Sequence, residues 1–217
     1  HAYHRRQRQM CIRDSIFTFR TMLIKKINSK YSIILGSNSP RRREILKKLG
    51  FNFNVKISSY DENINFKKYS AAKAVKIIAE KKSFDIQQKI SKNILIITAD
   101  TTVLVNDKIL NKPQNKKEAK EMIIKLSNNT HKVITGVCIR SFNKKVCFSS
   151  TTKVNFFEIN NSEIDYYLNN FAFEDKAGSY AIQDWIGIFK VRKIEGCFFN
   201  VVGMPASKLC DKLNLFL

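Results

Sequence analysis

Residues 37–43, with the sequence SNSPRRR, place two serine hydroxyls and three arginines at the start of a predicted helix. Ser39 is a favourable N-cap, and Pro40 suits the first helical position because its missing N–H would have no partner there. Arginines in a first turn oppose the helix dipole, which favours negative charge at that end. Unpaired N–H groups at a helix N-terminus bind phosphate. The segment therefore predicts a phosphate-binding loop; the alternative is an ordinary Ser-Pro cap followed by solvated arginines.

Carboxylates and lysines are expected near the ends of other predicted elements. These groups are Asp61, Glu62, Lys82, Asp100 and Lys112. Carboxylates suit a hard divalent cation, and lysines and arginines suit polyphosphate. Each residue alone is better explained as a surface charge. Together they predict metal-assisted hydrolysis of a phosphate ester or anhydride, with Mg²⁺ or Mn²⁺ as the cation.

The elements that must position these groups follow from hydrophobic periodicity. The run 94–100, ILIITAD, is apolar until Asp100 and predicts a central strand that ends at this carboxylate. Further strands are expected at 31–35, 51–57, 101–105 paired with 108–110, 133–139, 146–157, 186–194 and 197–202. Helices are expected at 40–49, 70–90, 115–127, 162–168 (capped by Asn161 or Ser162) and from Pro205 onward, with a loop at 173–184. Strands and helices mix without strict alternation, which predicts an α/β fold: one domain of two lobes, with a mixed sheet flanked by helices.

Composition narrows the class of protein. The chain has 217 residues, 44% of them hydrophobic, and a formal net charge of +21. The basic residues are scattered along the chain, which favours small anionic partners over nucleic acid. No apolar run reaches the roughly 20 residues of a membrane span. The five cysteines (Cys11, Cys138, Cys147, Cys197, Cys210) form no CxxC pair, which argues against zinc and predicts a reducing, cytoplasmic setting.

Several common catalytic motifs are absent from the sequence. It contains no P-loop, no GxGxxG, no HExxH and no GxSxG. Residues 1–21 carry five arginines and no core-forming pattern, so we expect a non-core N-terminal extension followed by a single domain at 22–217.

Six ordered segments resemble the Maf-type nucleotide pyrophosphatases. They are Ser37-Asn38-Ser39-Pro40-Arg41-Arg42 with Glu44-Ile45-Leu46, Ala99-Asp100-Thr101, Lys112-Pro113, Thr130 to Val137, Asp175 to Gln183, and Ile194 to Pro205. The resemblance covers the chain from about residue 31 onward. Departures from the family pattern fall at Thr102, Asn129, Ala181 and Asp184, and none removes a proposed catalytic group.

The resemblance implies an inosine-triphosphatase-like fold, an elongated mixed sheet with a cleft between two lobes. It also implies metal-dependent hydrolysis of nucleoside triphosphates to a monophosphate and pyrophosphate. Asp100 would be the general base, and Asp61 and Glu62 would hold the metal with it. Phosphate-binding roles would fall to Ser37, Ser39, Arg41, Arg42, Lys82 and Lys112. A homodimer is left open.

Three positions separate two branches of the family. Arg41, Thr101 and Gln183 match the branch that acts on dTTP and UTP, and the glutamine amide offers both a donor and an acceptor to a pyrimidine edge. Two alternatives stay open: the 7-methyl-GTP branch, and a non-catalytic nucleotide or nucleic-acid binder linked to septum formation.

Overall fold

A mixed seven-stranded sheet forms the centre of the structure, a computed structural model that describes residues 20–60, 69–87 and 93–217. The strand order is β2-β1-β3-β5-β6-β7, and β4 pairs with β3. β1 runs parallel to β2 and β3, and the remaining pairs are antiparallel. The strands are β1 (Ser32–Leu35), β2 (Phe53–Val55), β3 (Ile94–Val105), β4 (Lys108–Leu110), β5 (Thr130–Arg140), β6 (Lys145–Phe156) and β7 (Val191–Glu195). The predicted α/β fold with a mixed sheet is confirmed.

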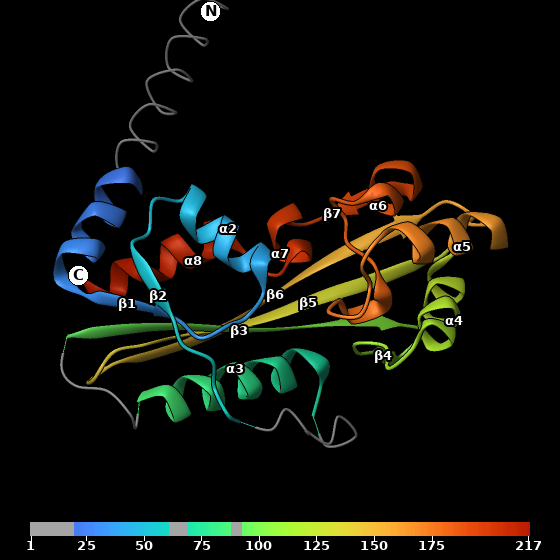
Figure 1. Cartoon of the computed structure of the whole chain (residues 1–217). Coiled ribbons are helices and arrows are strands. Elements are labelled where there is room, and N and C mark those ends of the chain that lie inside the picture. The colour runs from blue at the N-terminus through green and yellow to red at the C-terminus, as the bar shows by residue number, and fades with distance from the viewer. Residues whose placement is uncertain (1–19, 61–68, 88–92) are drawn as a thin grey trace, which may run out of the picture.

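Helices cover both faces of this sheet (Figure 1). α3 lies on one face, and α2 and α8 lie on the other beside the helix formed by residues 20–30. The helices are α2 (Pro40–Lys48), α3 (Ala71–Gln87), α4 (Lys116–Leu126), α5 (Asn161–Asn170), α6 (Trp185–Lys190), α7 (Phe198–Val202) and α8 (Ala206–Leu213), with 3-10 turns at Ala177–Ser179 and Asn214–Phe216. Across the described ranges, no helix combines the length and hydrophobicity that a membrane span requires.

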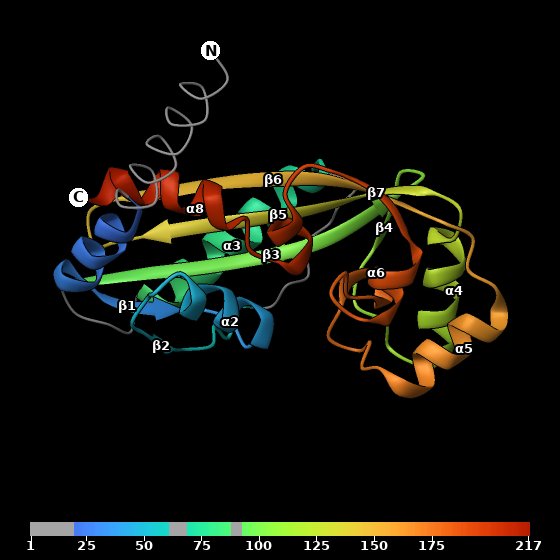
Figure 2. The same cartoon turned by 90° about the horizontal axis from the view of Figure 1, so that it is seen from above.

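Two hydrophobic cores define two lobes along the sheet. The first core joins β1 and α2 to α8, and includes Leu35, Leu46 and Leu209. The second joins the far ends of β3 and β6 to α4 and α5, and includes Ile123 and Tyr167. β3, β5 and β6 run through both lobes (Figure 2). The lobes are therefore two ends of one sheet.

A gap along one edge of β3 separates the two lobes. On one side β3 pairs with β5 from Ile96 to Leu104 without a break. On the other side it pairs with β1 at 94–97 and with β4 at 103–105. Among the described residues, no strand pairs with residues 98–102 at this edge. Asp100 therefore lies in the middle of β3, and the prediction that it ends a strand is wrong: the chain stays extended because pairing with β5 continues past it.

The strand predicted at 186–194 is wrong in part, and the strand predicted at 197–202 is wrong. Residues 185–190 form α6, which buries Ile186 and exposes Ile188, and only 191–195 form a strand. Residues 198–202 form α7, which ends at Gly203 in a left-handed conformation with φ 113°. Short apolar runs do not distinguish a helix from a strand by periodicity.

Smaller differences fall at helix starts and at the N-terminal side of the domain. The N-cap of α5 is Asn160, which forms a capping box with Glu163, in place of the predicted Asn161 or Ser162. The helix at 20–30, which was not predicted, buries Leu23 and Ile27 in the first core. Residues 1–19 lie outside the described residues, so the boundary of the extension at residue 21 stays a prediction.

A buried histidine supports the wall of the second lobe. His131 on β5 is 1% exposed, and its Nε2 lies 2.6 Å from Tyr180 Oη. Its ring also meets those of Phe156 and Tyr180 edge to face. Burial lowers the pKa of His131 to about 3, so the imidazole is neutral in the folded protein.

We expect stability to fall on mild acidification because of His131. Below pH 6.5 the unfolded chain binds a proton at this residue that the folded chain does not, so acid favours unfolding. The free energy of unfolding should fall by up to about 1.4 kcal/mol for each pH unit below 6.5. This loss should end near pH 3, the pKa of His131 in the folded protein. Urea unfolding between about pH 7.5 and 5, where carboxylates contribute little, measures the slope. His131→Gln should flatten it, and an unchanged slope in that variant would refute the assignment.

Candidate active site

A pocket of about 550 Å³ opens where β3 lacks a strand neighbour. Residues 36–43 and 201–203 contribute to its wall on one side, and residues 175–183 of the second lobe contribute on the other. Every predicted site residue that the structure describes lines it: Ser37, Ser39, Arg41, Arg42, Lys82, Asp100, Thr101, Lys112 and Gln183. Asp61 and Glu62, the other two predicted metal ligands, lie outside the described residues.

The loop from β1 to α2 forms the cap that the sequence predicts. Ser39 is the N-cap, its hydroxyl accepts from the backbone N–H of Arg42, and Pro40 occupies the first turn. Ser37 lies in the same loop, where its Oγ accepts from the Ser39 N–H at 3.3 Å. The first turn of α2 contains no acidic residue. The N-terminus of α2 therefore contributes backbone dipole and basic side chains to the pocket wall.

Arg42 connects three separate parts of the chain. Its Nη1 donates to Ser37 Oγ at 3.0 Å and to the Ala99 carbonyl at 2.9 Å. Its Nη2 donates to Thr101 Oγ1 at 3.0 Å, and its Nε donates to the Gly203 carbonyl at 2.9 Å. The guanidinium thus joins the β1–α2 loop, the open edge of β3 and the end of α7. A fixed fork of donors makes arginine suited to such a role.

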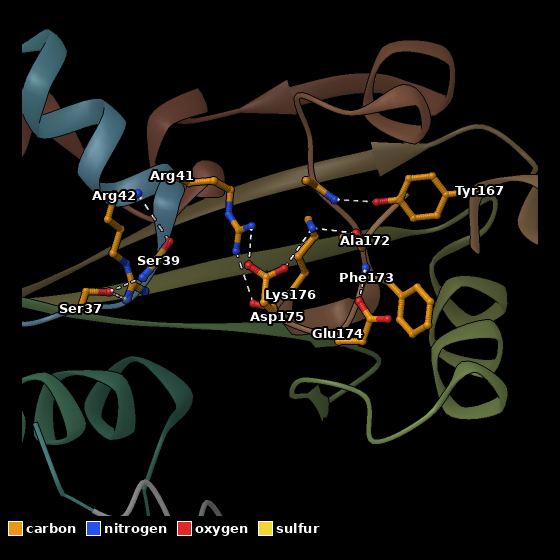
Figure 3. Close-up of polar contacts among 11 residues, drawn as sticks. Ser37, Ser39, Arg41, Arg42, Tyr167, Ala172, Phe173, Glu174, Asp175 and Lys176 are labelled. Atoms are coloured by element: carbon orange, nitrogen blue, oxygen red, sulfur yellow. Dashed lines mark hydrogen bonds and ion pairs between the residues drawn. The ribbon is translucent and has the colours of Figure 1, made fainter. Parts of the chain in front are cut away.

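Arg41 reaches across the pocket to the second lobe (Figure 3). Its Nη1 pairs with Asp175 Oδ2 at 2.8 Å, and its Nη2 donates to the Asp175 carbonyl at 3.3 Å. Lys176 Nζ pairs with the other Asp175 oxygen at 3.0 Å and donates to the Ala172 carbonyl at 2.7 Å. Partial burial acts to raise the pKa of Asp175, but hydrogen bonds and the charges of Lys176 and Arg41 hold it below its usual range. The three side chains therefore form a charged link between the lobes.

The Asp100 carboxylate faces α3, on the opposite face of β3 from Thr101. Side chains alternate along a strand, so Thr101 meets Arg42 while Asp100 meets Lys82. Lys82 Nζ lies 3.3 Å from Asp100 Oδ1, and these side chains are 11% and 14% exposed. Gly136 lies opposite Asp100 on β5, and a Cβ there would stand 2.4 Å from the backbone of Val75. The glycine thus allows α3 to approach β5 closely and present Lys82 at the pocket.

The carboxylate chemistry of the pocket fits a magnesium or manganese ion. Mg²⁺ is commonly bound through one or two carboxylates together with substrate phosphates. Asp100 supplies one such carboxylate at the pocket wall. Within the three described ranges, no group of three or more His, Cys, Asp or Glu side chains is arranged to hold a metal without help from a substrate. This donor set matches a cation that is shared with bound phosphates.

Sequence reasoning did not single out several groups in the wall of the pocket. Asp175, Lys176 and Tyr180 line it, and Lys176 is only 8% exposed. They lie in residues 175–183, a segment in which the sequence motif assigned a role in substrate choice to Gln183 alone. Its mixture of opposite charges and glycine was a signal that could have identified Asp175 and Lys176.

The family of the chain follows from its sequence comparisons. A family model described as Maf-like protein matches residues 32–216. That span contains the pocket and the whole sheet. The chain therefore belongs to the Maf family, as the ordered motifs predict.

Similar proteins carry a consistent name. A dTTP/UTP pyrophosphatase of Phocaeicola vulgatus is 43% identical over 85% of this chain and 96% of its own length. A protein of the same name from Bacillus pumilus is 42% identical over 85% of this chain and 96% of its own length. One from Flavobacterium johnsoniae is 36% identical over 88% of this chain and 98% of its own length. A solved nucleoside-triphosphatase, a dITP/XTP pyrophosphatase from Mycobacterium abscessus, is 9% identical with a TM-score of 0.38, and the match covers 59% of this chain and 75% of that one.

We expect Arg42→Lys to destabilise the fold as well as the pocket. A lysine keeps the charge but cannot reach all four acceptors, so part-buried oxygens lose their donors. The free energy of unfolding should fall by about 2–3 kcal/mol, measured by urea unfolding. Arg43→Lys is the matched control and should change it by less than about 1 kcal/mol, because the Arg43 guanidinium donates to the exposed side chain of Asn38. Unchanged stability in Arg42→Lys would mean that this residue serves only to bind ligand.

Proposed function

We propose that this protein hydrolyses nucleoside triphosphates to the monophosphate and pyrophosphate, with dTTP and UTP as preferred substrates. Membership of the Maf family and the shared name of its similar proteins support the reaction class. The activity would belong to nucleotide metabolism, either cleaning the nucleotide pool or acting alongside cell division.

The arrangement of charge in the pocket carries this proposal. Asp100 stands among cationic groups supplied by both lobes: Arg41, Lys82, Lys112 and Lys176. The other carboxylate of the described lining, Asp175, is paired with Arg41 and Lys176. Cationic side chains around a pocket of this size suit a polyphosphate attached to a nucleoside. Asp100, which lies outside the ion pairs that link the lobes, is then the carboxylate assigned to act on the water that the reaction requires.

The proposed chemistry places Asp100 as the general base. It takes a proton from a water molecule whose oxygen forms a bond to the α-phosphorus. The bond from this phosphorus to the α–β bridging oxygen breaks, and pyrophosphate leaves. Lys82 orients the carboxylate through its 3.3 Å contact. The reaction needs this alignment because attack on phosphorus proceeds in line with the leaving group.

Phosphate binding is assigned to groups around the α2 N-terminus and the lysines. Ser37, Ser39 and the first-turn N–H groups would hold one phosphate, while Arg41, Lys82 and Lys112 would hold the others. Arg42, predicted as a phosphate ligand, makes four hydrogen bonds to protein acceptors, and these contacts support a role in shaping the loop that binds phosphate.

A divalent cation, Mg²⁺ or Mn²⁺, is proposed as cofactor. Asp100, with Asp61 and Glu62, would hold it beside the phosphates. When bound, it would neutralise charge on the phosphate oxygens.

Substrate choice is assigned to Arg41, Thr101 and Gln183. The Gln183 amide lines the pocket and can both donate to and accept from a pyrimidine edge. Arg41 is held on the same side by Asp175. We further propose a cytoplasmic location, which the free thiols of the four described cysteines support. A homodimer is a separate proposal, to be tested by light scattering.

Asp100→Asn should lose most turnover while keeping its fold. The amide is similar in shape but cannot accept the proton, so we expect a loss on the order of 10²-fold or more. Release of pyrophosphate from dTTP measures it. Asp107→Asn, at the exposed β3–β4 turn, is the matched control and should retain normal turnover. Near-normal turnover in Asp100→Asn would refute the assignment of the base.

A panel of nucleotides tests the proposed function directly. With Mg²⁺ or Mn²⁺, pyrophosphate release should be much faster from dTTP and UTP than from 7-methyl-GTP, and EDTA should abolish it until metal is restored. Gln183→Glu should slow the pyrimidine substrates selectively, because a carboxylate has no donor for their edge. Faster release from 7-methyl-GTP would reassign the branch. Nucleotide binding without release from any substrate would favour the non-catalytic alternative.

A further inference from the structure

Two cysteines face each other across β5 and β6, outside the pocket. Cys138 and Cys147 are direct partners in the register of these antiparallel strands. Both are free thiols, and Cys138 is buried while Cys147 is partly exposed. Successive side chains alternate between sheet faces, so opposed residues point to the same face. Ser83 of α3 donates to Cys138 Sγ at 3.4 Å, which places the pair on the face that α3 covers.

The hydrogen-bond pattern shows which kind of strand pair the cysteines form. At the hairpin that joins the strands, Ser141 N–H donates to the Lys144 carbonyl, so 141 and 144 are a hydrogen-bonded pair. Hydrogen-bonded and non-hydrogen-bonded pairs alternate along an antiparallel ladder. Along the ladder from this pair, residue 140 pairs with 145, 139 with 146 and 138 with 147, without a register shift. Cys138 and Cys147 therefore occupy a non-hydrogen-bonded position.

This position brings the sulfur atoms close enough to react. Residues in non-hydrogen-bonded pairs have Cα atoms roughly 4.5 Å apart, and disulfides span Cα separations of about 4.4–6.8 Å. Because opposed residues also point to the same face of the sheet, the two sulfur atoms face each other. The register therefore places the two cysteines at the short end of the range of separations that a disulfide spans.

The surroundings of Cys138 favour its reactive form. The pKa of the Cys138 thiol is lowered because Cys147 and Ser83 donate hydrogen bonds to its sulfur and Arg140 adds positive charge. Arg140 Nε also donates to Ser83 Oγ at 2.9 Å, which holds the hydroxyl in place. The thiolate is the nucleophile in disulfide exchange.

We propose that Cys138 and Cys147 form a thiol–disulfide site that closes in the presence of a disulfide oxidant such as oxidised glutathione. The contact with Cys138 and partial burial raise the pKa of Cys147, so its proton first passes to the Cys138 sulfur. The Cys147 sulfur then attacks one glutathione sulfur, which forms a mixed disulfide and releases one glutathione thiolate, and this thiolate takes the proton from Cys138. The Cys138 thiolate then attacks Cys147 Sγ, the mixed disulfide breaks, and a second glutathione thiolate leaves. Two protein thiols are oxidised, one oxidised glutathione is reduced, and the two thiol protons pass to the released thiolates. The short Cα separation predicts a disulfide that reduced glutathione reopens readily.

Peptide mapping of the native protein tests this proposal. The folded chain is incubated with oxidised glutathione, its remaining thiols are alkylated, and it is digested with trypsin. Trypsin cleaves after Lys132, Arg140, Lys145 and Lys153, so the cysteines fall in separate peptides, 133–140 and 146–153. We expect these two peptides to appear linked, lighter by two hydrogen atoms than their sum, and to separate after incubation with excess reduced glutathione.

Two variants control the assignment. Cys197→Ser should leave the linked pair unchanged, since Cys197 lies on the loop between β7 and α7. Cys147→Ser should abolish it and leave Cys138 alkylated only after unfolding. The proposal is overturned if oxidised wild-type protein, with an unchanged circular dichroism spectrum, yields no linked pair while Cys197 takes up glutathione. Linkage that occurs only between separate chains, detected as a covalent dimer, would overturn it equally.

Discussion

The pocket exists because the Arg42 side chain takes the place of a missing strand. Between β1 and β4, the edge of β3 has no strand partner in the described structure, and backbone groups there need hydrogen bonds. Arg42 donates to the Ala99 carbonyl at this edge while also holding Ser37, Thr101 and the end of α7. A strand would have satisfied the same carbonyl but would have filled the space. One guanidinium on a helix satisfies this carbonyl and leaves room beside Asp100.

The neighbouring arginine has a different structural role. Arg41 pairs with Asp175, so the wall of the pocket is completed by an ion pair between the two lobes. Its side chain is 19% exposed and that of Asp175 is 49% exposed, so solvent screens the pair. A contact of this kind contributes little to stability but fixes where the guanidinium points. Two adjacent residues of one sequence motif thus have different roles. Arg42 makes hydrogen bonds within the first lobe, and Arg41 makes an ion pair across the pocket with the second lobe.

The sequence predicted most of this arrangement for reasons that can be stated. Ser39 and Pro40 specify the start of α2 by local chemistry, and the apolar run at 94–97 identifies the central strand because it is buried on both faces. Contacts between residues that are distant in sequence could not be predicted. Nothing in the sequence near Asp100 shows that β5 pairs past it, so the strand was predicted to end too early. Gly187 of α6 lies against the backbone of Ile182, a close approach that only the folded chain reveals. Asp175 was missed because its importance depends on Arg41, which is distant in sequence and close in space.

The two cores are assembled from the chain in different ways. The second core draws its buried residues from one continuous stretch, from Val103 to Ile186. The first core combines Leu23 and Ile27 of the helix at 20–30 with Leu209 and Leu213 of α8. During synthesis from the N-terminus, the second core has all of its buried residues available before α8 has been made. The first core, with its long sequence separations, closes only afterwards. Ser37 and Arg42 precede and begin the helix that packs in this first core, so the wall of the pocket that they form is completed only after α8 has been made.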